Sequence, residues 1–175
     1  MIFENLQLDL EDLPTVETIR YQKLAPAHLT IRLISTGLFY AFLLLAMVIV
    51  FTFGENITPE LYYILPIIWL CLAGISFWLA SASYKVKAYA LRQKDIVYRK
   101  GVIVRSVTTI PFNRVQHCEI KQGPIARFFG LKTLALFTAG GQMSDLSIPG
   151  LLPQEAEQLK DFIIKKTAED RYEEA

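Results

Sequence analysis

The sequence predicts a membrane hairpin of two α-helices, followed by a β-rich module that a C-terminal helix closes. Two long uncharged apolar runs, 33–53 and 61–84, predict the hairpin. Stretches of alternating apolar and polar residues after residue 84 predict strands, and an apolar stripe of helical period after Pro153 predicts the final helix. The expected parts are a lead segment 1–32, a hairpin 33–84 and a module 85–175.

Each apolar run is long enough to cross a bilayer, whose hydrocarbon core of about 30 Å needs about 20 helical residues. We expect the spans at about 33–53 and 61–83. Buried core helices are the weaker alternative, because a soluble chain of 175 residues has little room to bury both. A signal peptide is not expected, because the lead segment carries five acidic against three basic residues, whereas a secretory leader begins with a short basic region.

Basic residues flank the hairpin and are missing from its connector, 54–60, which carries only Glu55 and Glu60 as charged residues. Loops rich in Lys and Arg stay in the cytoplasm. We therefore expect both termini in the cytoplasm and the connector outside. The flanking bases are Arg20, Lys23, Arg32, Lys85, Lys87, Arg92 and Lys94.

The module is expected to begin as a series of strands. Residues 95–111 are typical of a hairpin, with two alternating runs around a turn in which Gly101 takes a positive φ. A Gly-Gly loop at 140–141 is expected to join two later strands. The remaining strands are expected within 84–93, 117–122, 131–141 and 145–150.

The last element is expected to be a helix over about 153–168. Proline suits its first turn, and the early acids Glu155 and Glu157 suit its positive end. A run of strands closed by one amphipathic helix predicts a small barrel or bent sandwich with one open end plugged. The expected apolar stripe consists of Ala156, Leu159, Phe162, Ile163 and Ile164.

The stretch "HCEIK" brings together residue types that form nucleophile-and-base sites in enzymes. Neighbouring side chains on a strand point to opposite faces. Cys118 is then expected on the core face with Ile120, and His117 on a polar face with Glu119 and Lys121. A thiol–imidazole pair needs hydrogen-bond contact, so we predict no catalytic site here. No cofactor or metal is expected either, because the sequence has no phosphate-binding loop and no paired metal ligands.

The charge of the module is its strongest signal. Between Lys85 and Leu151, eleven Lys and Arg residues and three acids give a net charge of +8. A basic surface beside an anionic leaflet is attracted to it; an ordinary solvated surface is the alternative. Nucleic acid is not expected, because no stacking aromatics accompany the bases in a known motif. The candidate residues for contact with lipid or a partner are Lys85, Lys87, Arg92, Arg114, Lys121, Arg127 and Lys132.

Several short blocks carry a family resemblance: "YQKLAPAHLTIR", the turn at Asp95, the glycine at 101, "IPFNRVQ", "QGPIARFFGL" and "LALFTAGG". Over about residues 20–168 the chain resembles the YdbS-like bacterial membrane proteins, whose pleckstrin-homology-like (PH-like) domain has unknown function. The resemblance implies a PH-like seven-stranded bent sheet or barrel capped by a C-terminal helix. It also implies a multi-pass protein of the bacterial cytoplasmic (inner) membrane and a complex with a larger relative carrying several such domains. It supplies no catalytic or ligand residues.

The block "QGPIARFFGL" (122–131) also has a physical interpretation. Pro124 is expected to end a strand, because proline cannot continue a hydrogen-bonded ladder. One helical turn should follow, with Ile125, Phe128 and Phe129 packed mainly on the sheet. Contact of these side chains with the membrane or with a partner is the alternative.

These observations predict a non-enzymatic, membrane-anchored binding or assembly module, in a membrane complex or a homo-oligomer. The alternative is a protein that binds or handles anionic lipid at the cytoplasmic leaflet. An enzyme or a transporter subunit ranks third. The spans contain no Asp, Glu, Lys or Arg that could carry an ion or a proton.

The predicted orientation can be tested with a reporter enzyme that is active only outside the cytoplasm. The reporter should be active when inserted near Asn56 and silent when fused after Ala175, because the basic flanks hold both ends inside. Activity of the C-terminal fusion would reverse the assigned orientation.

Overall fold

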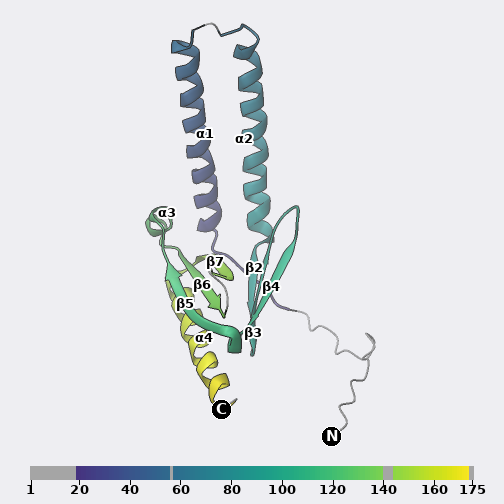
Figure 1. Cartoon of the computed structure of the whole chain (residues 1–175), viewed down its shortest axis with the longest axis vertical. Coiled ribbons are helices and arrows are strands. Elements are labelled where there is room, and N and C mark those ends of the chain that lie inside the picture. The colour runs from purple at the N-terminus through teal and green to yellow at the C-terminus, as the bar shows by residue number, and fades with distance from the viewer. Residues whose placement is uncertain (1–18, 56, 140–143, 174–175) are drawn as a thin grey trace, which may run out of the picture.

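A computed structural model describes residues 19–55, 57–139 and 144–173, and shows two long helices rising from one end of a β-rich module (Figure 1). The acids expected in the lead segment and the Gly-Gly loop at 140–141 lie outside the described residues. The elements are β1 Gln22–Lys23, α1 Ala27–Phe53, α2 Leu61–Val86, β2 Ala88–Leu91, β3 Asp95–Lys100, β4 Ser106–Pro111, the 3₁₀ turn η2 Phe112–Arg114, β5 Val115–Lys121, α3 Pro124–Phe128, β6 Lys132–Thr138, β7 Leu146–Leu151 and α4 Pro153–Glu173.

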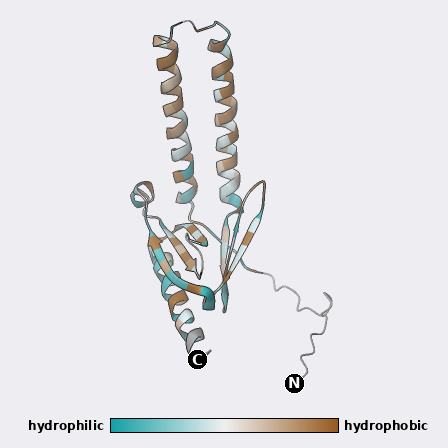
Figure 2. Cartoon of the chain, in the orientation of Figure 1, coloured by the Kyte–Doolittle hydropathy of each residue, from teal (hydrophilic) through white to brown (hydrophobic). Residues whose placement is uncertain are grey.

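Helices α1 and α2 form the expected hairpin, and both are long and apolar enough to cross a membrane. Figure 2 shows apolar residues along most of their length. Several polar contacts join the helices. Among them, the Tyr40 hydroxyl lies 2.7 Å from Ser76 Oγ, and Trp69 Nε1 donates to the Tyr40 carbonyl at 3.2 Å. Such contacts satisfy polar groups that lipid cannot. Helix α1 begins before the expected span, at Ala27, and α2 continues to Val86.

The module is built from two antiparallel sheets, ordered β1-β2-β3-β4 and β5-β6-β7. Helix α4 packs against β5, β6 and η2 and covers the core between the sheets. This arrangement agrees with the predicted PH-like fold, in which a C-terminal helix closes a bent sheet. The largest fully buried side chains are Tyr98, Phe112, Ile96, Leu131, Leu134, Leu136, Ile148, Leu151, Ile163, Val97 and Val115.

The lead segment contributes a strand that the sequence analysis did not anticipate. Gln22 pairs with Tyr89 and Lys23 pairs with Ala88, so β1 extends the first sheet. The module therefore begins before the hairpin and not at residue 85. Its first two strands are neighbours in the sheet, although the whole hairpin separates them in sequence.

The β3–β4 connection differs from the predicted hairpin in length. Strand β3 ends at Lys100, which pairs with Ser106, so residues 101–105 form a loop. The second strand of the predicted hairpin therefore begins at Ser106, later than expected. Gly101 has a φ of 97°, which confirms the positive φ predicted for the turn. The displaced residues of the run, 102–104, are apolar and lie in the loop.

Helix α4 begins at Pro153 as predicted and continues to Glu173, beyond the expected end near residue 168. Glu155 Oε2 accepts a hydrogen bond from the Leu152 backbone N–H at 3.0 Å and satisfies a free donor at the helix start. The predicted stripe is buried or partly buried except at Ile164, which is 48% exposed. Ile164 therefore lies outside the packed face of the helix.

Replacing Gly101 by alanine should destabilise the module by about 1–3 kcal/mol, because a side chain at positive φ is strained and its Cβ would meet the Val104 carbonyl oxygen. Gly123→Ala is the matched control, since Gly123 has φ −73° and open space around it. Thermal unfolding of the detergent-solubilised chain measures both variants. Equal stability of the two would contradict the turn assignment.

Candidate functional site at the base of the membrane hairpin

The base of the hairpin is the region where α1 and α2 join the module, and three hydrogen bonds fasten it. The Ala25 N–H donates to the Gly150 carbonyl at 2.9 Å. The Tyr84 hydroxyl donates to the Leu24 carbonyl at 3.1 Å, and Arg99 Nε donates to the Val86 carbonyl at 3.3 Å. Both connections to the hairpin are thus tied to strands of the module.

A close approach between β7 and α1 adds to this fastening. Gly150 has a φ of 71°, and a Cβ there would lie 2.7 Å from the Cβ of His28. Only glycine fits this position without displacing the helix. His28 is buried against the strand, so it belongs to the joint between hairpin and module.

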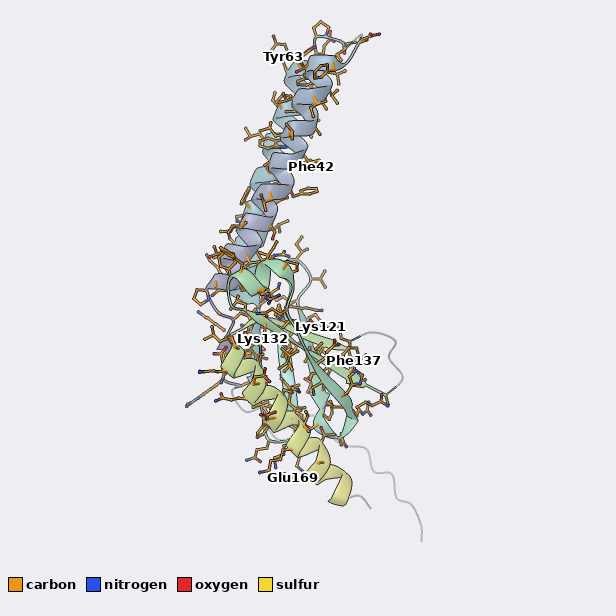
Figure 3. The ribbon with its side chains drawn as sticks, turned by 90° about the vertical axis from the view of Figure 1, so that its left-hand side faces the viewer. Phe42, Tyr63, Lys121, Lys132, Phe137 and Glu169 are labelled. Atoms are coloured by element: carbon orange, nitrogen blue, oxygen red, sulfur yellow. The ribbon has the colours of Figure 1, made fainter. Side chains whose placement is uncertain are left out.

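The seven basic candidates are split between two ends of the module. Lys85 and Lys87 are at the end of α2, and Arg127 is on α3, which contacts α1. Lys121 ends β5 and Lys132 begins β6, on either side of α3. Figure 3 shows Lys121 and Lys132 on the hairpin side of the module, and Glu169 toward the opposite end. Five candidates therefore share the base of the hairpin.

The other two candidates, Arg92 and Arg114, lie at the far end. Arg92 is in the turn from β2 to β3 and pairs with Asp95, with Nε 3.6 Å from Oδ1. Arg114 ends the turn η2 that follows Pro111, and Pro111 is the strand partner of Asp95. Strand β2 carries the chain away from the hairpin, so proximity in sequence does not place Arg92 beside the spans.

The five basic residues at the base of the hairpin differ in whether an acidic side chain lies beside them. Lys121 lies 3.1 Å from Glu119, and Lys132 lies 2.6 Å from Glu157 on α4. Lys87 sits among other cations. Burial lowers the pKa of Lys87, and the charges of Arg32 and Lys100 lower it further. The positive potential around Lys87 would be relieved by an anion.

Helix α3 is held as a short projection beside α1. Gln122 Nε2 donates to the Leu131 carbonyl at 3.0 Å, and buried Leu131 anchors the returning chain. The predicted helical turn is confirmed, but core packing is wrong for Phe128 and Ile125, which are 87% and 40% exposed. The hydrogen bond from Gln122 to Leu131 joins the chain on either side of α3, and the end of α3 at Phe128 points away from the core.

The β3–β4 loop is a second projection at the same end. Figure 1 shows the tip of this hairpin rising beside the base of α2. Ile103 is 84% exposed and Val104 is 79% exposed. Sequence reasoning missed these two residues because it placed them in a strand. The signal that could have found them is a run of apolar residues directly after a turn glycine.

The side chains of β5 from His117 to Ile120 alternate between two faces of the strand, as predicted. Cys118 and Ile120 are partly buried and pack against the core. His117 is exposed and stacks on Phe137 with ring centroids 4.2 Å apart. Burial raises the pKa of the Cys118 thiol to about 11. Cys118 therefore has the surroundings of a core thiol rather than those of an activated nucleophile.

The chain matches the family model described as bacterial PH domain over residues 37–167, which run from within α1 to within α4. The chain belongs to the bacterial PH domain family. It is similar to the UPF0699 transmembrane protein YdbS of Bacillus subtilis (strain 168), with 31% identity over 57% of this chain and 62% of YdbS. It is also similar to the UPF0699 transmembrane protein YdbT of the same organism, with 28% identity over 52% of this chain.

The similarity covers less than two thirds of either relative, and only 19% of YdbT. No solved structure matches the chain. The two relatives are named transmembrane proteins, in agreement with the apolar hairpin of this bacterial PH domain protein. Membership of the family supports the predicted YdbS-like resemblance and the PH-like fold.

Cys118 of this bacterial PH domain should alkylate slowly near neutral pH. A pKa of about 11 instead of 9.0 reduces the thiolate fraction at pH 7.5 about a hundredfold. Labelling in a Cys71→Ala background by a charged maleimide should accelerate as pH approaches 11, or when denaturant exposes the thiol. Rapid labelling of folded protein at pH 7.5 would contradict the buried-thiol interpretation.

Proposed function

We propose that the chain is a membrane-anchored binding module that holds a partner protein in a fixed orientation at the bilayer and performs no catalysis. The insertion of the hairpin between paired strands carries this proposal. Strand β1 leads into α1, α2 returns into β2, and β1 and β2 lie side by side in one sheet. Connections this short leave the module little freedom to swivel on its anchor.

The outer edge of β4 is the surface that we propose for the partner. Strand β4 is the last of its sheet, and no strand among the described residues pairs with its outer edge. Val107 and Thr109 on this strand are exposed. An open strand edge offers unpaired backbone donors and acceptors to an extended segment of another chain.

The partner that we propose is a second membrane protein with bacterial PH domains. Two relatives in one organism support this choice, because the similar stretch fills 62% of one and 19% of the other. A short protein and a much longer one with related domains are suited to form a complex. A homo-oligomer through the same edge is the alternative partner arrangement.

A charge at the β4 edge should separate the partner from the purified chain. Thr109→Glu places a carboxylate where the partner strand would pair, whereas Gln158→Glu adds the same charge on the exposed surface of α4. Tagged chain purified from its native membranes in mild detergent should retain a larger PH-domain protein with Gln158→Glu and lose it with Thr109→Glu. Mass spectrometry identifies the retained protein, and the molar mass of the purified complex in solution shows whether each variant keeps it.

Equal retention by the two variants would contradict the β4 edge as the contact. A monomer that brings no second PH-domain protein from native membranes would contradict assembly itself. A homo-oligomer lost only with Thr109→Glu would keep the edge and replace the proposed partner by a second copy.

Contact with anionic lipid is the second candidate, and the clustering of five basic candidates at the base of the hairpin favours it. Lys87 lies among like charges there, and Arg127 is on the projection beside α1. Each base near an anionic leaflet adds on the order of 1 kcal/mol of attraction, which salt weakens. This role is compatible with partner binding, because the β4 edge and the base use different residues.

A further inference from the structure

Exposed apolar side chains of the module gather at the end that carries the hairpin. Among the described residues after the spans, seven large apolar side chains are exposed. Only Ile164, midway along α4, lies away from the base. The other six belong to the β3–β4 loop and its flank, to α3, or to the residue before α4: Ile103, Val104, Val107, Ile125, Phe128 and Leu152.

Two projections carry the most exposed of these side chains and flank the hairpin. Phe128 is at the tip of α3, which contacts α1. Ile103 is in the loop that rises beside α2 in Figure 1. The two projections come from different sheets, and the described part of the module gives neither tip a buried environment.

The length of the spans places these tips at the level of the lipid headgroups. Helix α1 has 27 residues and is about 40 Å long, whereas the hydrocarbon core is about 30 Å thick. Its first turns, up to Arg32, therefore extend below the hydrocarbon. A projection that lies against these turns reaches the boundary between headgroups and acyl chains.

Basic residues accompany both apolar tips. Lys100 precedes the β3–β4 loop, Arg105 is its last residue, and Arg127 precedes Phe128 on α3. Apolar side chains with neighbouring Lys or Arg suit a membrane interface, because the apolar group enters the acyl boundary while the base meets phosphate.

We propose that the β3–β4 loop and α3 insert their apolar tips into the leaflet from which the module hangs. The ligand class is the bilayer interface itself, and the inserted side chains are Ile103, Val104 and Phe128. Continuity with the spans selects lipid over a protein partner, since the same end of the module already meets the membrane. Insertion on both sides of the hairpin would hold the module upright and leave the β4 edge free.

Depth can be measured on the full chain in a Cys71→Ala, Cys118→Ala background. Phe128→Cys, Ile103→Cys and the control Ile164→Cys each receive an environment-sensitive fluorophore and are reconstituted in vesicles of phosphatidylglycerol and phosphatidylcholine. All three positions are exposed, so labelling leaves the core intact. Labels at 128 and 103 should show blue-shifted emission, and nitroxide-bearing lipids should quench them several-fold more strongly than the label at 164.

Aqueous iodide provides the opposite readout and should quench the label at 164 several-fold more strongly than the other two. Equal iodide quenching at all three positions, with no lipid quenching at 128 and 103, would overturn the proposal. Vesicles of phosphatidylcholine alone separate apolar insertion from charge attraction. Persistence of the blue shift there supports insertion, and its loss would overturn the apolar contribution and leave only attraction to anionic lipid.

Discussion

The pairing of β1 with β2 is the interaction on which the rest of the architecture depends. Two residues, Gln22 and Lys23, join the strand that follows α2 and thereby close the hairpin at its base. The entry and exit of the hairpin must then lie one strand spacing apart, about 4.8 Å. The hydrogen bonds from Tyr84 to Leu24 and from Ala25 to Gly150 reinforce this closure. The module and its anchor thus share one sheet.

Fixing the anchor in the sheet gives the module two chemically different ends. Strands alternate in direction, so the connections that follow β3 and β5 return to the hairpin and those that follow β2 and β4 lie away from it. The returning connections are the ones with exposed apolar tips. The described turn from β2 to β3, at the remote end, instead contains the ion pair of Arg92 with Asp95. This difference in composition is consistent with one end meeting lipid and the other meeting water.

The polar residues of β5 illustrate how a suggestive sequence can serve packing. Alternation sends the Cys118 thiol toward the core and the His117 ring outward onto Phe137. Lys121 also approaches the Phe137 ring, with Nζ 5.4 Å from its centroid. The outer face of the β5–β6 pair therefore combines aromatic rings with the ion pair of Lys121 and Glu119, whereas its inner face contributes to the core beneath α4.

The sequence by itself determined the two long apolar helices, the faces of residues 117–121 on β5, the positive φ of Gly101 and the start of α4, because each depends on local periodicity or backbone sterics. It did not determine β1, which is too short to show any period. It also did not determine which bases gather at the hairpin, or that Phe128 is exposed. These depend on which end of each strand faces the membrane, and only the order and direction of the strands decide that.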